Sequence, residues 1–279
     1  MTVTSSPRSR PRFSRTLALA RWPEYRELLR AALEEGYAVV ALEDWLENPP
    51  EGRCMILRHD VDQHPRSALT MAGIEEDLGL RSTWYFRWRT ADERVVASLR
   101  ERGFQLGLHY ETLSRLVLAL KLDASDVTPF LIDWCRGALK EEIEAFEMRF
   151  GPIRSICPHG DSRVPFINNG SLTRDISVET LGVRWDSNEA MRGRRLEHWL
   201  TDRSAADGNW HAGVNPRELL RQGLTSILCL THPNNWVSGP GLWADRAVRL
   251  VVLPYTIRRG RPPGRLSCTG IDRPPSLHA

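Results

Sequence analysis

The chain has 279 residues, 41% of them hydrophobic, which is enough for a sizeable core and argues against wholesale disorder. Its net charge of +3 is too small to indicate a nucleic-acid partner, and its arginines are scattered among acidic residues. Five widely spaced cysteines without a C-x-x-C pair indicate neither a disulfide framework nor a zinc knuckle, and they fit a reducing compartment.

Apolar segments long enough for a signal peptide or a membrane span are not found in the sequence. The apolar stretch of the N-terminal region covers only Leu17–Ala20, and the longest apolar run is Leu116–Leu120. We therefore expect a cytoplasmic protein with neither a membrane nor a nucleic-acid partner. The composition predicts a flexible segment over residues 1–20, one domain over 21–256 and an Arg- and Pro-rich tail over 257–279.

Short apolar stretches alternate with segments of helical periodicity along most of the chain. In chain order, the sequence predicts a helix over 23–35, strands over 37–42 and 54–58, a helix over 65–79, a strand over 82–88, a helix over 92–102, a strand over 104–108, a helix over about 131–149, strands over 153–157 and 183–185, a helix over 216–222 and a strand over 227–230. This alternation predicts a parallel sheet covered by helices, and the chain length suits an α/β barrel.

Four of the predicted strands end in side chains that bind metals or move protons. These residues are Asp60 with Asp62, His109, His159 and His232. In parallel α/β folds the functional site lies at the carboxyl ends of the strands. We therefore expect all four strand ends to contribute to one site.

The two aspartates, separated by Val61, are expected on one side of an extended segment. One carboxylate can then bind a divalent cation while the other stays free as a general base for the attacking water. The alternative interpretation is that Asp62 only decorates the turn before the helix that Pro65 opens, where Asp is common.

One carboxylate and two imidazoles, with open positions for water and substrate, make a reasonable catalytic metal site. The residues alone do not decide which of His109, His159 and His232 bind the metal and which one protonates a leaving amine. Each histidine taken singly has the alternative of an ordinary structural role. Competing nucleophile and phosphate-binding motifs are absent from the sequence: it has no G-x-S-x-G, no P-loop and no G-x-G-x-x-G.

Candidate substrate contacts are Arg87, Glu111, Asn235 and Trp236. Arg87 ends the predicted strand 82–88 and suits a bidentate contact with an anion, although a structural ion pair explains it equally well. Asn235 and Trp236 follow His232 and suit hydrogen bonding and ring stacking with a sugar, although they also fit a plain surface turn.

Several motifs taken together resemble the polysaccharide deacetylase (NodB-homology) family, with most similarity to a WbmS-like branch linked to surface-sugar biosynthesis. The motifs are Leu57–Asp62, Ser82–Phe86, Gly107–Glu111, Pro158–Asp161, Leu200–Asp202 and Thr231–Trp236. The resemblance implies a distorted, incomplete (β/α) barrel, one divalent metal with zinc as the expected ion, and hydrolysis of N-acyl groups on sugars. It also implies that Asp60 is the base, that Asp62 and His109 bind the metal, and that His232 acts on the leaving group.

The chain departs from the family pattern at one metal ligand. The family's second histidine follows the first by four residues, and Leu113 stands there in this chain. We therefore expect His159 to be the third ligand. The leading hypothesis is a metal-dependent amide hydrolase, a deacetylase or deformylase acting on an amino sugar or a sugar-containing small molecule. The alternative that Leu113 favours is a metal-free carbohydrate-binding descendant of a deacetylase.

Overall fold

The computed structural model describes residues 20–192, 194, 196–202, 210 and 213–237. Within them, parallel strands form one curved sheet in the order β6-β5-β4-β3-β2-β8-β7, and β1 pairs with β2 as an additional strand. The strands are β1 (Ala38–Ala41), β2 (Cys54–Val61), β3 (Thr83–Phe86), β4 (Gln105–Tyr110), β5 (Ser155–Pro158), β6 (Trp185–Asp186), β7 (His198–Thr201) and β8 (Ser226–Thr231). This arrangement is a distorted, incomplete (β/α) barrel, as the sequence predicts.

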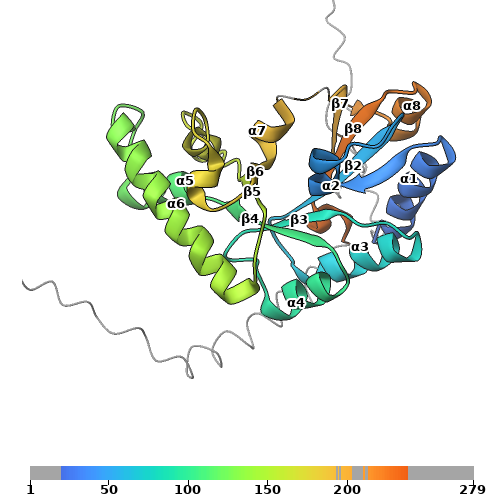
Figure 1. The fold of residues 1–279 in the computed structure, drawn as a ribbon, viewed down its shortest axis with the longest axis horizontal. Helices are drawn as coiled ribbons and strands as arrows, with labels where there is room; N and C mark the ends of the chain where they lie inside the picture. The colour runs from blue at the N-terminus through green and yellow to red at the C-terminus, as the bar shows by residue number, and fades with distance from the viewer. Residues whose placement is uncertain (1–19, 193, 195, 203–209, 211–212, 238–279) are drawn as a thin grey trace, which may run out of the picture.

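Helices follow most of the strands and flank the curved sheet (Figure 1). The α-helices are α1 (Trp22–Glu34), α2 (Leu42–Glu47), α3 (Arg66–Asp77), α4 (Glu93–Glu101), α5 (Thr112–Leu120), α6 (Pro129–Phe150), α7 (Ser187–Arg192) and α8 (Pro216–Arg221). Single turns of 3-10 helix cover Asn169–Leu172, Val178–Leu181 and Pro233–Trp236. Two of the long helices begin with a proline in the first turn, where its missing N–H costs nothing.

Strand β2 lies at the centre of the sheet and is buried along its whole length. Its first half pairs with β1, its second half pairs with β3, and β8 runs along its other edge. Because every neighbour is parallel, the carboxyl ends of these strands meet at one rim of the barrel. Strand β2, which carries Asp60 and leads into Asp62, is thus held by three neighbouring strands.

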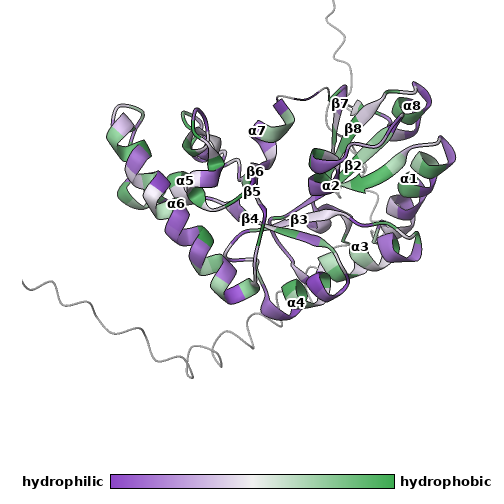
Figure 2. Ribbon diagram, viewed as in Figure 1, coloured by the Kyte–Doolittle hydropathy of each residue, from purple (hydrophilic) through white to green (hydrophobic). Residues whose placement is uncertain are grey.

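Two hydrophobic clusters lie on the two faces of the sheet. The larger one fills the space between the strands and the outer helices α1, α3, α4, α6 and α8. In Figure 2 these helices carry both hydrophobic residues (green) and hydrophilic residues (purple). The smaller one fills the barrel interior with alternate strand residues, including Ile56, Tyr85 and Leu228. Helix α2 closes the interior at the amino ends of the strands, where Leu42 N–H donates to Thr83 Oγ1 (2.9 Å) and Ser155 Oγ–H to Glu43 (2.6 Å).

Several elements differ from the predicted ones or add to them, and β6 (Trp185–Asp186) overlaps the predicted strand 183–185 at Trp185 alone. The predicted strand 37–42 ends at Ala41, and helix α2 begins at Leu42. The apolar side chains of α2 recur at i, i+3 and i+4, as in a helix, but α2 is too short for this period to be recognised in the sequence. Helix α5 is apolar on most sides, so its sequence showed only a short hydrophobic run. Helix α7 and strand β7 are short as well, with six and four residues.

Gly107 in β4 lies where the barrel wall leaves no space for a side chain. A Cβ at this position would lie 2.5 Å from Ser155 O and 2.5 Å from the ring of Tyr85. We expect Gly107→Ala to lower the free energy of unfolding by about 1–3 kcal/mol, the usual cost of overpacking, and the melting temperature by several degrees.

Gly137 in the middle of α6 is the matched control, because a Cβ there meets nothing within 4 Å. Gly137→Ala should leave the melting temperature unchanged or raise it, since Ala favours a helix more than Gly does. Equal melting temperatures for Gly107→Ala and the unmodified protein would contradict the close approach of Tyr85 to β4.

The predicted N-terminal segment, apart from Ala20, and the predicted tail lie outside the described residues, and so does the end of the predicted domain beyond residue 237. Among the helices that the structure describes, none combines the length and the apolar character that a membrane span requires.

Candidate metal centre and active site

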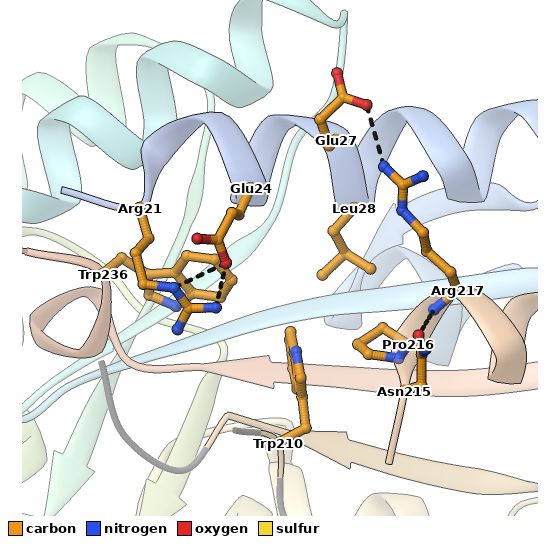
Figure 3. A pocket seen from close by; sticks show the side chains of 9 residues that line it. All are labelled: Arg21, Glu24, Glu27, Leu28, Trp210, Asn215, Pro216, Arg217 and Trp236. Carbon is orange, nitrogen blue, oxygen red and sulfur yellow. Dashed lines mark hydrogen bonds and ion pairs between the residues drawn. The ribbon is translucent and has the colours of Figure 1, made fainter. Parts of the chain in front are cut away.

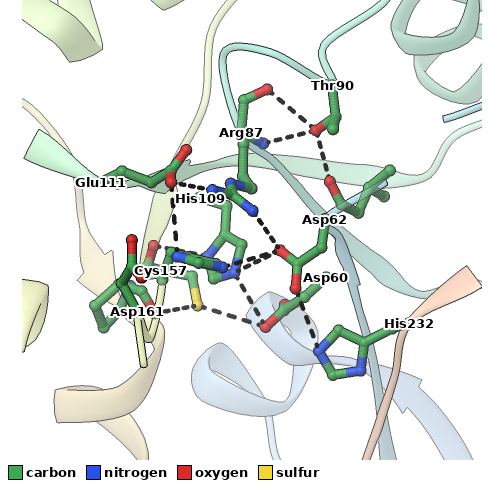
Figure 4. A network of polar contacts seen from close by, with 12 residues as sticks. Asp60, Asp62, Arg87, Thr90, His109, Glu111, Cys157, Asp161 and His232 are labelled. Carbon is green, nitrogen blue, oxygen red and sulfur yellow. Dashed lines mark hydrogen bonds and ion pairs between the residues drawn. The ribbon is translucent and has the colours of Figure 1, made fainter. Parts of the chain in front are cut away.

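The carboxyl ends of four strands bring acidic and imidazole side chains together, as Figure 4 shows. Asp60 lies in β2 and His109 in β4, while Asp62, His159 and His232 come directly after β2, β5 and β8. Alternation along β2 turns Arg58 and Asp60 to the barrel interior and His59 to the opposite face. His59 is fully buried there between Thr231 (2.6 Å) and Glu75 (2.9 Å), away from the site.

Asp62, His109 and His159 form a compact group of three potential ligands, which we call the metal group. Their ligand atoms all lie within 4.8 Å of one another. Asp62 Oδ1 is 3.5 Å from the Nε2 atom of His109 and 3.5 Å from that of His159. Two ligands of a tetrahedral zinc ion, each about 2.0–2.1 Å from it, lie about 3.3 Å apart. The two distances from Asp62 are therefore close to those expected between ligands of such a site.

The polar atoms of this group are better arranged to bind a cation than to form hydrogen bonds with one another. Asp62 Oδ1 is buried and has no hydrogen-bond partner among the described residues. His109 Nδ1 lies 3.0 Å from the backbone carbonyl of Cys157, a contact that places the ring proton on Nδ1 and leaves the Nε2 lone pair facing Asp62. Burial is the largest cause that lowers the pKa of His159, to about 4, so its imidazole is neutral at pH 7, as metal binding requires.

Two further groups of potential ligands overlap with the first. One joins Asp60, His109 and Cys157, and the other joins Glu111, His159 and Asp161. Their carboxylates already have strong cationic partners, because Arg58 binds Asp60, Arg87 binds Glu111 and Arg163 binds Asp161. The group around Asp62 is therefore the best candidate for a divalent metal.

Leu113 does not face this group. Its side chain is fully buried in the large hydrophobic cluster between the sheet and the outer helices. His159, which we expected as the third ligand in place of Leu113, comes from the end of the next strand of the sheet. The ligand set Asp62, His109 and His159 stays a prediction, and its three members lie together.

Asp60 is buried beside the metal group and is held by a bidentate ion pair. Arg58 Nε and Nη2 donate to its two carboxylate oxygens over 2.9 and 2.7 Å, and Asp60 Oδ2 lies 3.6 Å from His109 Nε2. Burial by itself would raise the pKa of Asp60, but the positive charge of Arg58 holds it well below its usual range. Asp60 is therefore an ionised carboxylate with one fixed orientation.

His232 lies on the other side of the aspartates (Figure 4). It is fixed by Asp202. Its Nδ1–H donates to Asp202 Oδ1 (2.7 Å), and its backbone N–H donates to Asp202 Oδ2 (2.9 Å). Its Nε2 points to the site, 3.9 Å from Asp62 Oδ2. Burial disfavours the charged imidazolium, but the hydrogen bond and charge of Asp202 outweigh it and raise the pKa of His232 to about 9.

Replacing Asp202 is expected to weaken His232 as a proton donor. A histidine that must be protonated loses this function as the pH rises through its pKa, and without the charge of Asp202 that pKa is lower. Asp202→Asn should therefore lower turnover about tenfold or more at neutral pH and shift the alkaline loss of activity to lower pH. A pH–rate profile identical in shape to that of the unmodified protein would contradict the pairing.

Arg87 and Glu111, both predicted to contact substrate, form a buried ion pair with each other. Arg87 also lies 3.8 Å from Asp62, and His159 Nδ1 lies 3.7 Å from Glu111. This pair therefore borders the metal group and helps to position it. Contact of either side chain with a substrate stays a prediction.

Trp236 and Asn235 follow His232 in a 3-10 turn. Trp236 is 2% exposed, and its Nε1–H donates to Asp202 Oδ2 (2.9 Å). This hydrogen bond helps to orient Asp202, the partner of His232. The edge of its ring, together with Trp210, borders a cavity of about 270 Å³ between α1 and α8 (Figure 3). Substrate contacts of Asn235 and Trp236 likewise stay predictions.

Arg58 and Asp202 are functional candidates that the sequence analysis did not single out. Arg58 precedes Asp60 by two residues in the same strand, so alternation places both on one face, and this signal was present in the sequence. Asp202 follows β7, a short edge strand that was not predicted, and only its quoted motif pointed to it.

Searches against protein-family models and against curated proteins give no match for this chain. Among solved structures it is similar to a family 4 carbohydrate esterase from Streptomyces lividans in complex with acetate, with a TM-score of 0.36 and 14% identity over 74% of this chain and 90% of that chain. It is also similar to the Xyl-CE4 domain of a multidomain xylanase from the hindgut metagenome of Trinervitermes trinervoides. There the TM-score is 0.37, with 11% identity over 75% of this chain and 85% of that chain. Both likenesses are distant, and we infer the activity from the residues of the site.

Proposed function

We propose that this protein is a metal-dependent hydrolase that removes an N-acyl group, acetyl or formyl, from an amino sugar or a sugar-containing small molecule. The observation that carries the proposal is the group of Asp62, His109 and His159 with an ionised carboxylate, Asp60, beside it and with His232, whose pKa is raised, facing Asp62. The sugar as substrate, zinc as the metal and a WbmS-like branch are proposed from the sequence motifs. In this proposal the natural substrate is a small molecule of the cytoplasm.

Asp62, His109 and His159 would hold the cation. When bound, a divalent cation polarises the acyl oxygen and lowers the pKa of water, to about 7 in favourable zinc sites. Asp60 then accepts the proton of the attacking water. Because Arg58 makes Asp60 a weak base, Asp60 needs an acidified water, and this requirement ties the carboxylate to the metal group.

His232 donates a proton to the departing amine. An amine is a poor leaving group unless it is protonated, and His232 is kept in its protonated form by Asp202. Its Nε2 faces Asp62 from the side opposite Arg87 and Glu111 (Figure 4), so the acid and the buried ion pair border Asp62 from two sides.

The test is acyl release from matched amide and ester substrates. An N-acetyl amino sugar and the corresponding O-acetyl sugar are incubated with the metal-loaded protein, and acetate and free amine are measured. We expect amine formation, and we expect His232→Ala to slow the amide far more than the ester while retaining metal, because an alkoxide depends less on an acid. Absence of amine formation from N-acetyl and N-formyl sugars by the metal-loaded protein would reject the proposal.

A further inference from the structure

A second functional surface adjoins the metal group at the same rim of the barrel. A cavity of about 430 Å³ is lined by Trp88, Arg89, Glu111, Arg115 and Arg163. These residues come from the segments that follow β3, β4 and β5, three neighbouring strands of the sheet. Glu111 belongs to both places, since its Oε1 lies 3.7 Å from His159 Nδ1.

The three arginines of this cavity keep hydrogen-bond donors that no described residue uses. Arg115 is 57% exposed and uses Nη1 on Glu142 (3.0 Å), which leaves Nε and Nη2. Arg163 is 62% exposed and uses Nε and Nη2 on Asp161, which leaves Nη1. Arg89 is exposed and has no hydrogen-bond or ion-pair partner among the described residues. Arg115 and Arg163 are thus oriented in advance by acidic residues, and all the donors of Arg89 are available to a ligand.

The charge of the cavity favours an anion. Its one acidic lining residue, Glu111, is already paired with Arg87 behind it. Partial desolvation and then repulsion from Arg87 lower the pKa of Arg89, while the charges of Glu111 and Asp62 act in the opposite direction. An anionic group between Arg89, Arg115 and Arg163 would relieve this repulsion.

Trp88 gives the cavity a rigid aromatic wall. Its ring packs edge-to-face on Phe146 (5.6 Å between centroids) and against Phe150 (5.9 Å), both in α6. A ring fixed in this way and partly exposed to the cavity suits the flat face of a sugar or a base.

We propose that this cavity binds a phosphate ester, so that the substrate is an N-acyl amino sugar carrying a phosphate or a diphosphate. Arg89, Arg115 and Arg163 would bind the phosphate oxygens, and Trp88 would contact the adjoining ring. The inference rests on the proposed function for the identity of the sugar, but the binding of phosphate does not depend on hydrolysis. A sugar held here by its phosphate can extend past Glu111 to the metal group.

The test measures binding by calorimetry to protein treated with a chelator, so that neither the metal nor turnover contributes. The probes are N-acetylglucosamine, its 1-phosphate and its uridine diphosphate ester. We expect both phosphorylated probes to bind at least tenfold more tightly than the neutral sugar. Arg89→Gln and Arg163→Gln should each remove about tenfold of affinity for the phosphorylated probes and none for the neutral sugar.

Arg221→Gln is the matched control, because Arg221 is an exposed arginine of α8, on the opposite side of the molecule from α5 and α6 (Figure 1). It should leave every affinity unchanged. Equal affinity of the two phosphorylated probes would support recognition of the phosphate alone. Tighter binding of the nucleotide probe that Trp88→Leu abolishes would support a base on the aromatic wall.

Equal affinities for neutral and phosphorylated sugars would overturn this inference. So would unchanged affinities in Arg89→Gln and Arg163→Gln variants that melt at the temperature of the unmodified protein. If phosphate-dependent binding is found but no acyl group is ever released, only the proposed function fails. If neutral amino sugars are hydrolysed as fast as phosphorylated ones, and the arginine variants hydrolyse both at the rates of the unmodified protein, only the phosphate site fails.

Discussion

Asp60→Asn is expected to keep the metal and the fold but to lose about a hundredfold or more in turnover, the usual scale for a positioned acid or base. Asparagine has the shape of the carboxylate and can still accept a hydrogen bond from Arg58, but it cannot accept the proton of the attacking water. Asp60 is outside the three-residue metal group, so the metal content should stay near that of the unmodified protein. Turnover and metal content are measured on the same preparation.

Because Asp60 and Arg58 neutralise each other, removing the carboxylate also leaves a buried cation. The double variant Arg58→Met with Asp60→Asn controls for this charge, and it should be as inactive as Asp60→Asn while melting closer to the unmodified protein. Near-normal turnover of Asp60→Asn would reject its role as the base. Loss of metal in Asp60→Asn would instead move this residue into the ligand set.

His109→Ala is expected to remove the metal and the activity together. His109 is buried, its Nδ1 is engaged by the carbonyl of Cys157, and its Nε2 faces Asp62, so no other described side chain can take over its position. Loss of a ligand should weaken metal binding by more than about 100-fold, the upper range found for residues that only support a ligand. Affinity is measured by titration with zinc in competition with a chelator.

His198→Ala is the matched control for His109→Ala. His198 begins β7, at the end of the sheet away from the metal group, and should not affect zinc affinity. Zinc affinity of His109→Ala within a few fold of that of His198→Ala would contradict the ligand assignment.

Much of the fold could be predicted because the parallel strands are short apolar runs separated by helices with clear beginnings and ends. The four strand ends that carry Asp60, His109, His159 and His232 were evident for the same reason, since a polar residue after a buried strand stands out. Convergence of strand ends in parallel sheets then placed these residues together.

The supporting residues were harder to predict, because their role depends on which face or which edge strand carries them. Arg58 is a charged residue that follows four apolar residues in β2, and its burial is explained by its partners in the fold, Asp60 above all. Asp202 follows an edge strand of four residues, too short to recognise from its sequence. The partner of Arg87 could not be chosen from the sequence, because Glu111 is 24 residues away and the two meet only across neighbouring strands.

Activity as a function of added zinc tests the central claim most directly. The protein is stripped with a chelator, zinc is added in substoichiometric steps, and release of the amine from an N-acyl amino sugar phosphate is followed beside the neutral sugar. The account predicts no activity without metal and a linear rise that ends at one zinc ion per chain. Full activity of the stripped protein, or a rise that continues well past one equivalent, would contradict a hydrolase built on Asp62, His109 and His159.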